Sequence, residues 1–179
     1  MNQKLPVKIQ AETAAQVCAN FDLDSRARKL LRDEMSPQEF VKELIDKKQF
    51  VPAIEFLAHA LPVREGVWWG ALCMHHVMGE DLSLADQAAA SAAVMWVMQP
   101  DERTCAAAKA PGESADPLSA AGALALAASQ TADPWPFAHA ESVANAVKLA
   151  SLKMSGVNMQ KIQRAFVDLG LQVAEGGLL

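Results

Sequence analysis

The chain has 179 residues, of which 51% are hydrophobic, 21% are charged and 34 are alanine. This length and composition suit one folded domain with a buried core and exclude a disordered chain. The 16 basic and 21 acidic residues give a net charge of −5, so the chain lacks the positive charge that attracts nucleic acid or anionic membranes, and we expect neither as a partner.

Helix-forming patterns dominate the sequence, whereas tyrosine is absent and runs of alternating β-branched residues are rare. We therefore predict an all-α protein, a compact multi-helix bundle of about nine helices that can be built from stacked helical hairpins, in a single domain over residues 1–179. Two short helices come first, near 12–21 and 25–34, on helix propensity.

A clear helix start follows at Ser36. The Ser36 side chain can cap the helix, Pro37 suits a first helical turn, and Glu39 can complete a capping box. The apolar face of this helix continues to Ile45.

Prolines then mark two successive helices, over 52–61 and over 62–79. The second is apolar nearly all round, apart from Arg64, Glu65 and two histidines. We expect it to be the central helix of the bundle.

Ser83 and Asp86 begin a long alanine-rich helix that continues to Met98. Four more helices are expected, with Gly170 as the stop of the last one. They lie near 101–110, 117–131, 138–153 and 158–170.

Charge is distributed unevenly along the chain. Residues 1–65 form a charged helical part with 10 basic and 10 acidic residues, whereas residues 66–179 form an Ala- and Met-rich helical part with 6 basic and 11 acidic residues. These 17 charged residues are too few to give every helix after residue 66 a charged, solvent-exposed face. Either several of these helices are wholly internal, or an alanine-rich face meets another molecule.

The three cysteines, Cys18, Cys73 and Cys105, match neither a disulfide framework nor a zinc site. We therefore expect a reducing, cytoplasmic location. The N-terminus lacks the apolar core of a signal peptide, and the longest uncharged stretch, 117–132, is too weakly apolar to span a bilayer. We expect no insertion into a membrane.

The most distinctive segment is 61–76, which contains two adjacent tryptophans. On a helix, Arg64 lies next to Trp68 and Glu65 next to Trp69, because each pair is four residues apart. These residues can line a recognition groove, since tryptophan and arginine are frequent binding hot spots. In the alternative interpretation, the tryptophans anchor the core and the charged pair lies at its rim.

Methionine is concentrated in the weakly charged part of the chain, which contains six of the eight. Methionine side chains adapt to varied partners, although they also fill cores. Met95 and Met98, on the alanine-rich helix, complete the predicted binding residues, which are Arg64, Glu65, Trp68, Trp69, Met95 and Met98.

Signs of catalysis are weak. Cys73, His76 and Glu80 share one helix face, and Glu55 with His59 forms an i, i+4 pair on the preceding helix. This spacing matches neither the zinc peptidase nor the di-iron pattern, and the sequence has no nucleophile elbow and no phosphate-binding glycine loop. We assign no catalytic residue, no metal ligand and no cofactor.

Three segments carry a family resemblance. The segment at 61–73 reads LPVREGVWWGALC. It resembles the signature of an uncharacterised bacterial family that is helical throughout, and the core of that signature is Leu-Pro-x-Arg-Glu-x-Val-Trp-Trp. AVKLASLK at 146–153 and FVDLGLQVAEGG at 166–177 are similar to its closing segments. The resemblance implies a bacterial origin and a helical fold, and it implies no activity.

We expect a non-enzymatic protein-binding adaptor or chaperone that holds another polypeptide or pairs with itself. Small acidic helical proteins of bacterial secretion systems offer an analogy. One alternative is a small-ligand binder or metal-dependent enzyme with a site around Trp68, Cys73 and His76. A second alternative is a purely structural homo-oligomer.

Overall fold

The computed structural model describes residues 8–77, 82–132, 137–153 and 159–177. Within these ranges the chain forms ten α-helices and one short 3-10 helix, and no strand, so the all-α prediction is confirmed. The helices are α1 (Ala14–Cys18), α2 (Ser25–Arg28), α3 (Pro37–Asp46), α4 (Phe50–Ala60), α5 (Val63–Val77), α6 (Leu84–Met98), α7 (Glu102–Ser114), α8 (Ala120–Ser129), α9 (Ala138–Leu152) and α10 (Met159–Ala174), with the 3-10 helix at Gln130–Ala132.

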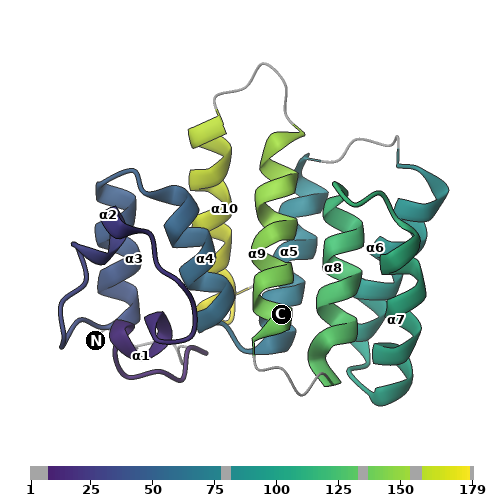
Figure 1. The fold of residues 1–179 in the computed structure, drawn as a ribbon, viewed down its shortest axis with the longest axis horizontal. Helices are drawn as coiled ribbons and strands as arrows, with labels where there is room; N and C mark the ends of the chain where they lie inside the picture. The colour runs from purple at the N-terminus through teal and green to yellow at the C-terminus, as the bar shows by residue number, and fades with distance from the viewer. Residues whose placement is uncertain (1–7, 78–81, 133–136, 154–158, 178–179) are drawn as a thin grey trace.

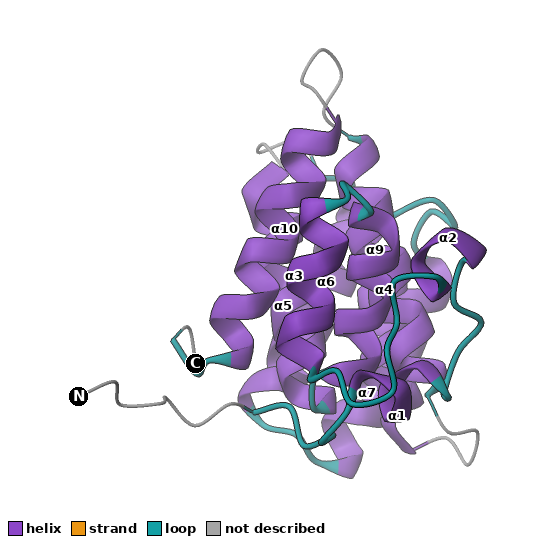
Figure 2. Cartoon of the chain, turned by 90° about the vertical axis from the view of Figure 1, so that its left-hand side faces the viewer, coloured by secondary structure: helices purple, strands orange, loops and turns teal. Residues whose placement is uncertain are grey.

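The helices stand side by side in a compact bundle (Figure 1). The N-terminal helices α1 to α3 occupy one end, α6 to α8 occupy the other, and α4, α5, α9 and α10 lie between them. Seen from the α1–α3 end, the long helices run roughly parallel or antiparallel to one another (Figure 2). One continuous hydrophobic core extends from Ile9 to Ala174.

Helix α5 contacts α4, α6, α8, α9 and α10, which confirms it as the central helix. Pro62 precedes it and accepts a hydrogen bond from the Gly66 amide at 2.9 Å. The charged N-terminal part joins the rest of the bundle mainly through α4, which packs on α9 and α10.

The predicted helix starts at Ser36 and Ser83 are confirmed. Ser36 Oγ accepts a hydrogen bond from the Glu39 amide at 3.3 Å, and the Glu39 carboxylate accepts one from the Ser36 amide at 2.9 Å. Ser83 Oγ accepts a hydrogen bond from the Asp86 amide at 3.1 Å, so α6 begins where its sequence predicts.

Several predicted boundaries were wrong. Helices α1 and α2 are shorter than expected, and α8 begins after Pro117, with Ser119 as its cap. Helix α7 continues through Pro111 to Ser114, although proline ordinarily ends a helix. Tertiary packing outweighs the lost hydrogen bond there, because buried Gly112 lies directly against Leu126 of α8.

Gly170 was predicted to end the last helix, but it lies inside α10 and permits a close helix contact. A Cβ at this position would lie 2.9 Å from Leu57 Cδ1 and 3.0 Å from Trp69 Cε2. The missing side chain therefore lets α10 approach α4 and α5. The same approach brings Trp69 Nε1 within 2.8 Å of the Phe166 carbonyl oxygen, to which it donates a hydrogen bond.

Replacing Gly170 with alanine is expected to lower the free energy of unfolding by about 1–3 kcal/mol, because the added methyl group overpacks the contact with Trp69. The measurement is the midpoint of urea unfolding. A lower midpoint reports lower stability when the dependence of the free energy of unfolding on urea concentration is unchanged.

Gly66→Ala is the matched control, because among the described residues a Cβ there would meet only Val143 Cγ2, at 4.0 Å. Alanine in this open helical position is expected to stabilise the protein by about 0.5–1 kcal/mol. Equal midpoints for the two variants would contradict the close-packing account of Gly170.

Candidate binding surface

Trp69 belongs to the core. Its side chain has 0% exposure, and its indole N–H is satisfied by the Phe166 carbonyl oxygen. Since the side chain offers no surface to a partner, its assignment as a binding residue is corrected to that of a core anchor between α5 and α10. Trp68 is half-buried and packs against the same core.

Arg64 and Glu65 connect α5 to its neighbours. Arg64 Nε donates a hydrogen bond to the Val97 carbonyl oxygen at 2.8 Å. The last carbonyls of a helix have no partner within it, so Arg64 secures the end of α6. Glu65 forms an ion pair with Lys8 Nζ at 2.8 Å and so holds the N-terminal segment on α5.

Met95 and Met98 are largely exposed, at 56% and 71%. With Leu84, which is 84% exposed, they lie along the outer side of α6. Ala88 and Ser91 are also exposed and lie between them. These five residues, Leu84, Ala88, Ser91, Met95 and Met98, form what we call the α6 stripe.

The α6 stripe follows the alternating four- and three-residue spacing of a coiled-coil seam. Because successive residues of an α-helix are rotated by about 100°, the stripe lies on the side of α6 opposite its four buried residues. Those residues are Ala89, Ala93, Trp96 and Val97.

The surface around the stripe carries no charge along the length of α6. Asp86 is the only charged residue of the helix, and its carboxylate accepts a hydrogen bond from Ser83 Oγ in the first turn. Gln87, Ala92 and Val94 flank the stripe. A partner can therefore cover this face of α6 without removing an ionised group of that helix from water.

A second apolar exposure lies between α8 and α9. A groove of about 400 Å³ there is lined by residues that include Leu126 and Leu149. Leu118 and Leu152 also line it and are strongly exposed. Polar Ser142, Asn145 and Lys148 interrupt this groove, so it is less continuous than the α6 stripe.

The residues considered for an enzyme site differ in their exposure. Cys73 is wholly buried, and burial raises the pKa of its thiol well above the ordinary value, which disfavours a thiolate. His76 is exposed and meets Phe166 edge-on, and Glu80 lies outside the described residues. Within those residues, no three His, Cys, Asp or Glu side chains are placed to hold a metal ion.

A polar pocket of about 220 Å³ lies between α4 and α9, lined partly by Glu55, His59, Glu141 and Lys148. Lys148 Nζ pairs with Glu55 Oε1 at 3.0 Å. Sequence spacing showed the Glu55 and His59 pair but not the pocket, because Lys148 is 93 residues from Glu55 and only the packing of α9 on α4 brings them together.

His59 is held in one tautomer at the edge of this pocket. Its Nδ1 lies 2.9 Å from the Glu55 carbonyl oxygen, which can only accept, so Nδ1 carries the proton. Nε2 is then a lone-pair acceptor, and it is buried without a hydrogen-bond partner among the described residues. The ring stacks on Phe21, with 4.4 Å between centroids.

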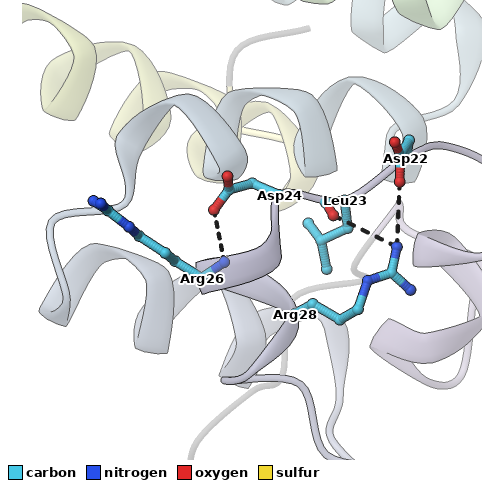
Figure 3. Close-up of polar contacts among 5 residues, drawn as sticks. All are labelled: Asp22, Leu23, Asp24, Arg26 and Arg28. Carbon is cyan, nitrogen blue, oxygen red and sulfur yellow. Dashed lines mark hydrogen bonds and ion pairs between the residues drawn. The ribbon is translucent and has the colours of Figure 1, made fainter.

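The loop that carries Phe21 is held by Arg28 (Figure 3). Arg28 Nη2 donates to Asp22 Oδ1 at 3.4 Å and to the Leu23 carbonyl oxygen at 3.5 Å. In the same view, the Asp24 carboxylate accepts a hydrogen bond from the Arg26 amide at 2.9 Å and caps α2. These contacts lie next to Phe21 and Asp22, which line one side of the polar pocket.

Comparison with known families places most of the bundle in one group. A family model described as a family of unknown function, DUF6931, matches residues 40–174. The chain belongs to the DUF6931 family. The predicted resemblance to an uncharacterised family is therefore confirmed, and no curated protein or solved structure matches the chain.

The DUF6931 match covers the α6 stripe completely and the polar pocket in part. It contains the whole α6 stripe and Arg64, which secures the end of α6. It leaves out Phe21 and Asp22 of the polar pocket. In the described part of this DUF6931 chain, no helix is both long enough and apolar enough to cross a bilayer.

The stability of this DUF6931 protein is expected to decrease as the pH falls from about 7 to 5. Burial lowers the pKa of His59, and it outweighs the hydrogen bond to the Glu55 carbonyl and the charges of Glu141 and Glu55, which raise that pKa. Burial also lowers the pKa of His139. The unfolded chain takes up protons at the ordinary value of about 6.5, before the folded protein does, so the free energy of unfolding declines through this window.

Urea unfolding at a series of pH values checks this expectation. His59→Phe keeps an aromatic ring against Phe21 but cannot titrate. The free energy of unfolding of this variant should therefore depend less steeply on pH, and His139 should account for the dependence that is left. An unchanged slope in His59→Phe would show that His59 is not held neutral by the fold.

Proposed function

We propose that this protein is a non-enzymatic protein-binding module, an adaptor or chaperone, and that the α6 stripe is its contact surface. The proposal rests on one observation: α6 has many more hydrophobic residues than it buries. Twelve of its fifteen residues are hydrophobic, yet only four are buried. By contrast, α8 has a similar alanine-rich composition and buries seven of its ten residues.

Covering the stripe is favourable because large apolar side chains leave water. Full burial of a Leu or Met side chain contributes about 1.5–3 kcal/mol. The stripe offers Leu84, Met95 and Met98 on one continuous face. Such a patch on a folded domain is typical of a protein contact.

The occupant that fits the stripe is an amphipathic helix. The alternating spacing of the stripe matches helix-to-helix packing, in which side chains of one helix enter the gaps of the other. Ala88 and Ser91 are small and leave room between the larger residues at either end. We infer that the partner helix presents large apolar side chains to these two positions.

A cytoplasmic location in a bacterium belongs to the same proposal. Cys18, Cys73 and Cys105 are all free and buried, which supports a reducing compartment. The resemblance of the 61–73 segment supports the bacterial origin. The net charge of −5 favours a polypeptide over nucleic acid as the partner.

The test is site-specific photo-crosslinking in cells that express the full chain. A benzophenone side chain placed at Ser91 should form adducts in which mass spectrometry identifies an apolar helical segment of another protein. The same probe at Leu152, which is 60% exposed on α9, is the control. Met95→Glu should reduce the Ser91 adduct about tenfold or more, because it places a charge in the apolar contact.

Adducts at Ser91 that survive Met95→Glu, or that are no more abundant than those at Leu152, would contradict the proposal. Circular dichroism should show an unchanged fold in Met95→Glu, because the side chain is exposed in the isolated chain.

A further inference from the structure

Helix α9 lies between α4 and α8 (Figure 1). The polar pocket is on its α4 side, and the apolar groove of about 400 Å³ is on its α8 side. Asn145 and Lys148 line both cavities, so the two adjoin along the outer face of α9. None of the described residues that line them belongs to α6. This face is therefore separate from the α6 stripe.

Polarity changes along the outer face of α9. Glu141, Asn145 and Leu152 are all exposed, and their spacing of four and seven residues places them within about 40° of one another around the helix. Glu141 is in the first turn of α9, and Leu152 is its last residue. The face is thus charged at one end and apolar at the other. The leucines that line the groove are Leu118, Leu126, Leu149 and Leu152.

The charged end of this face has a surplus of negative charge. The carboxylates of Asp22, Glu55 and Glu141 line the polar pocket, against the single cation Lys148. Lys148 Nζ pairs with Glu55 Oε1 at 3.0 Å. Arg28 contacts Asp22 at 3.4 Å in an exposed pair, which contributes little. Among the described residues Glu141 has no ion-pair partner.

Two further groups keep the balance negative. Burial lowers the pKa of His59, so its ring is uncharged at pH 7, and its Nε2 is a buried acceptor without a partner among the described residues. Asp116 lines the apolar groove and accepts a hydrogen bond from the Leu118 amide at 2.7 Å. A face with this charge attracts a cation and repels an anion.

The ligand that matches this face has one cationic end and one apolar end. A metal ion has no apolar part, and among the described residues no three His, Cys, Asp or Glu side chains are placed to hold one. An alkyl carboxylate would bring a second negative charge beside Glu141. A primary alkylamine supplies positively charged N–H donors at one end and hydrocarbon at the other.

We propose that this face of α9 binds a small amphiphilic cation, a primary aliphatic amine whose ammonium group pairs with Glu141 and whose alkyl chain lies in the leucine-lined groove. The groove volume falls within the roughly 300–1,000 Å³ of small-molecule sites, which are mostly apolar with a few polar groups that fix the orientation of the ligand. The inference goes beyond the proposed function and does not depend on it, because the α6 stripe takes no part.

Isothermal titration calorimetry of the full chain with 1-octylamine at pH 7 should show one binding site with a dissociation constant below about 1 mM. 1-Hexylamine has two methylene groups fewer and should bind about tenfold more weakly. Octanoate has the same number of carbon atoms but the opposite charge, and it should not bind measurably. Absence of octylamine binding, or octanoate binding as tight as that of octylamine, overturns the inference.

A charge variant tests the cationic end. Glu141→Gln should weaken octylamine binding about tenfold or more, because it removes the carboxylate that pairs with the ammonium group. Glu102→Gln is the matched control, since Glu102 is exposed on α7 and lines neither cavity. The control should leave the dissociation constant unchanged. Equal weakening by both variants would show a response to net charge alone and would overturn the inference.

A leucine variant tests the apolar end. Leu152→Asn should weaken octylamine binding about threefold or more, because part of the alkyl chain loses its apolar contact. Leu84→Asn, on the α6 stripe, is the matched control and should leave binding unchanged. Both leucines are strongly exposed, so both variants should fold. Weakening by Leu84→Asn but not by Leu152→Asn would place the amine on the α6 stripe and overturn the inference.

Discussion

A helix on the outside of a bundle can bury only one of its faces, and α6 is apolar on both. The side that faces α5, α7 and α8 holds Ala89, Ala93, Trp96 and Val97. The opposite side is the α6 stripe, where the side chains of Leu84, Met95 and Met98 are exposed to water. Removing this apolar surface from water is favourable in proportion to its area. The proposed role of the protein depends on this one mismatch between composition and burial.

The remainder of the bundle serves to hold α6 in place. Helix α5 is fixed at the centre by Trp69, whose ring and N–H fit against Gly170 and Phe166 of α10. From the first turn of α5, Arg64 reaches the Val97 carbonyl oxygen and ties the end of α6 to this centre. The tryptophan and arginine that are conspicuous in the sequence therefore support α6, whose outer side is the proposed contact surface, from behind.

The fold was largely predictable from the sequence because its signals are local. Capping residues such as Ser36 and Ser83 act within one helical turn, and the nearly uniform apolar surface of α5 identified the central helix. The errors came from tertiary contacts, which sequence spacing does not contain. Pro111 lies inside α7, where the next residue, Gly112, packs on α8, and Gly170 lies inside α10, where its missing side chain leaves room for Trp69.

The candidate surface was predicted only in part, for a related reason. Sparse charge after residue 66 indicated an exposed apolar face, and Met95 and Met98 lie on it, but the same pattern suits buried helices such as α8. Only the packing order of the helices decides which of them is left on the outside. Nor could spacing show the polar pocket, since its groups come from the loop after α1, from α4 and from α9.

Methionine oxidation in intact cells is the most direct measurement of whether the α6 stripe is covered. In the isolated chain Met95 and Met98 are more exposed than Met159, which is 46% exposed on α10. If a protein helix covers the stripe, brief peroxide treatment should oxidise Met159 faster than Met95 and Met98. If Met95 and Met98 are oxidised faster than Met159, the stripe is open to water and the account is contradicted.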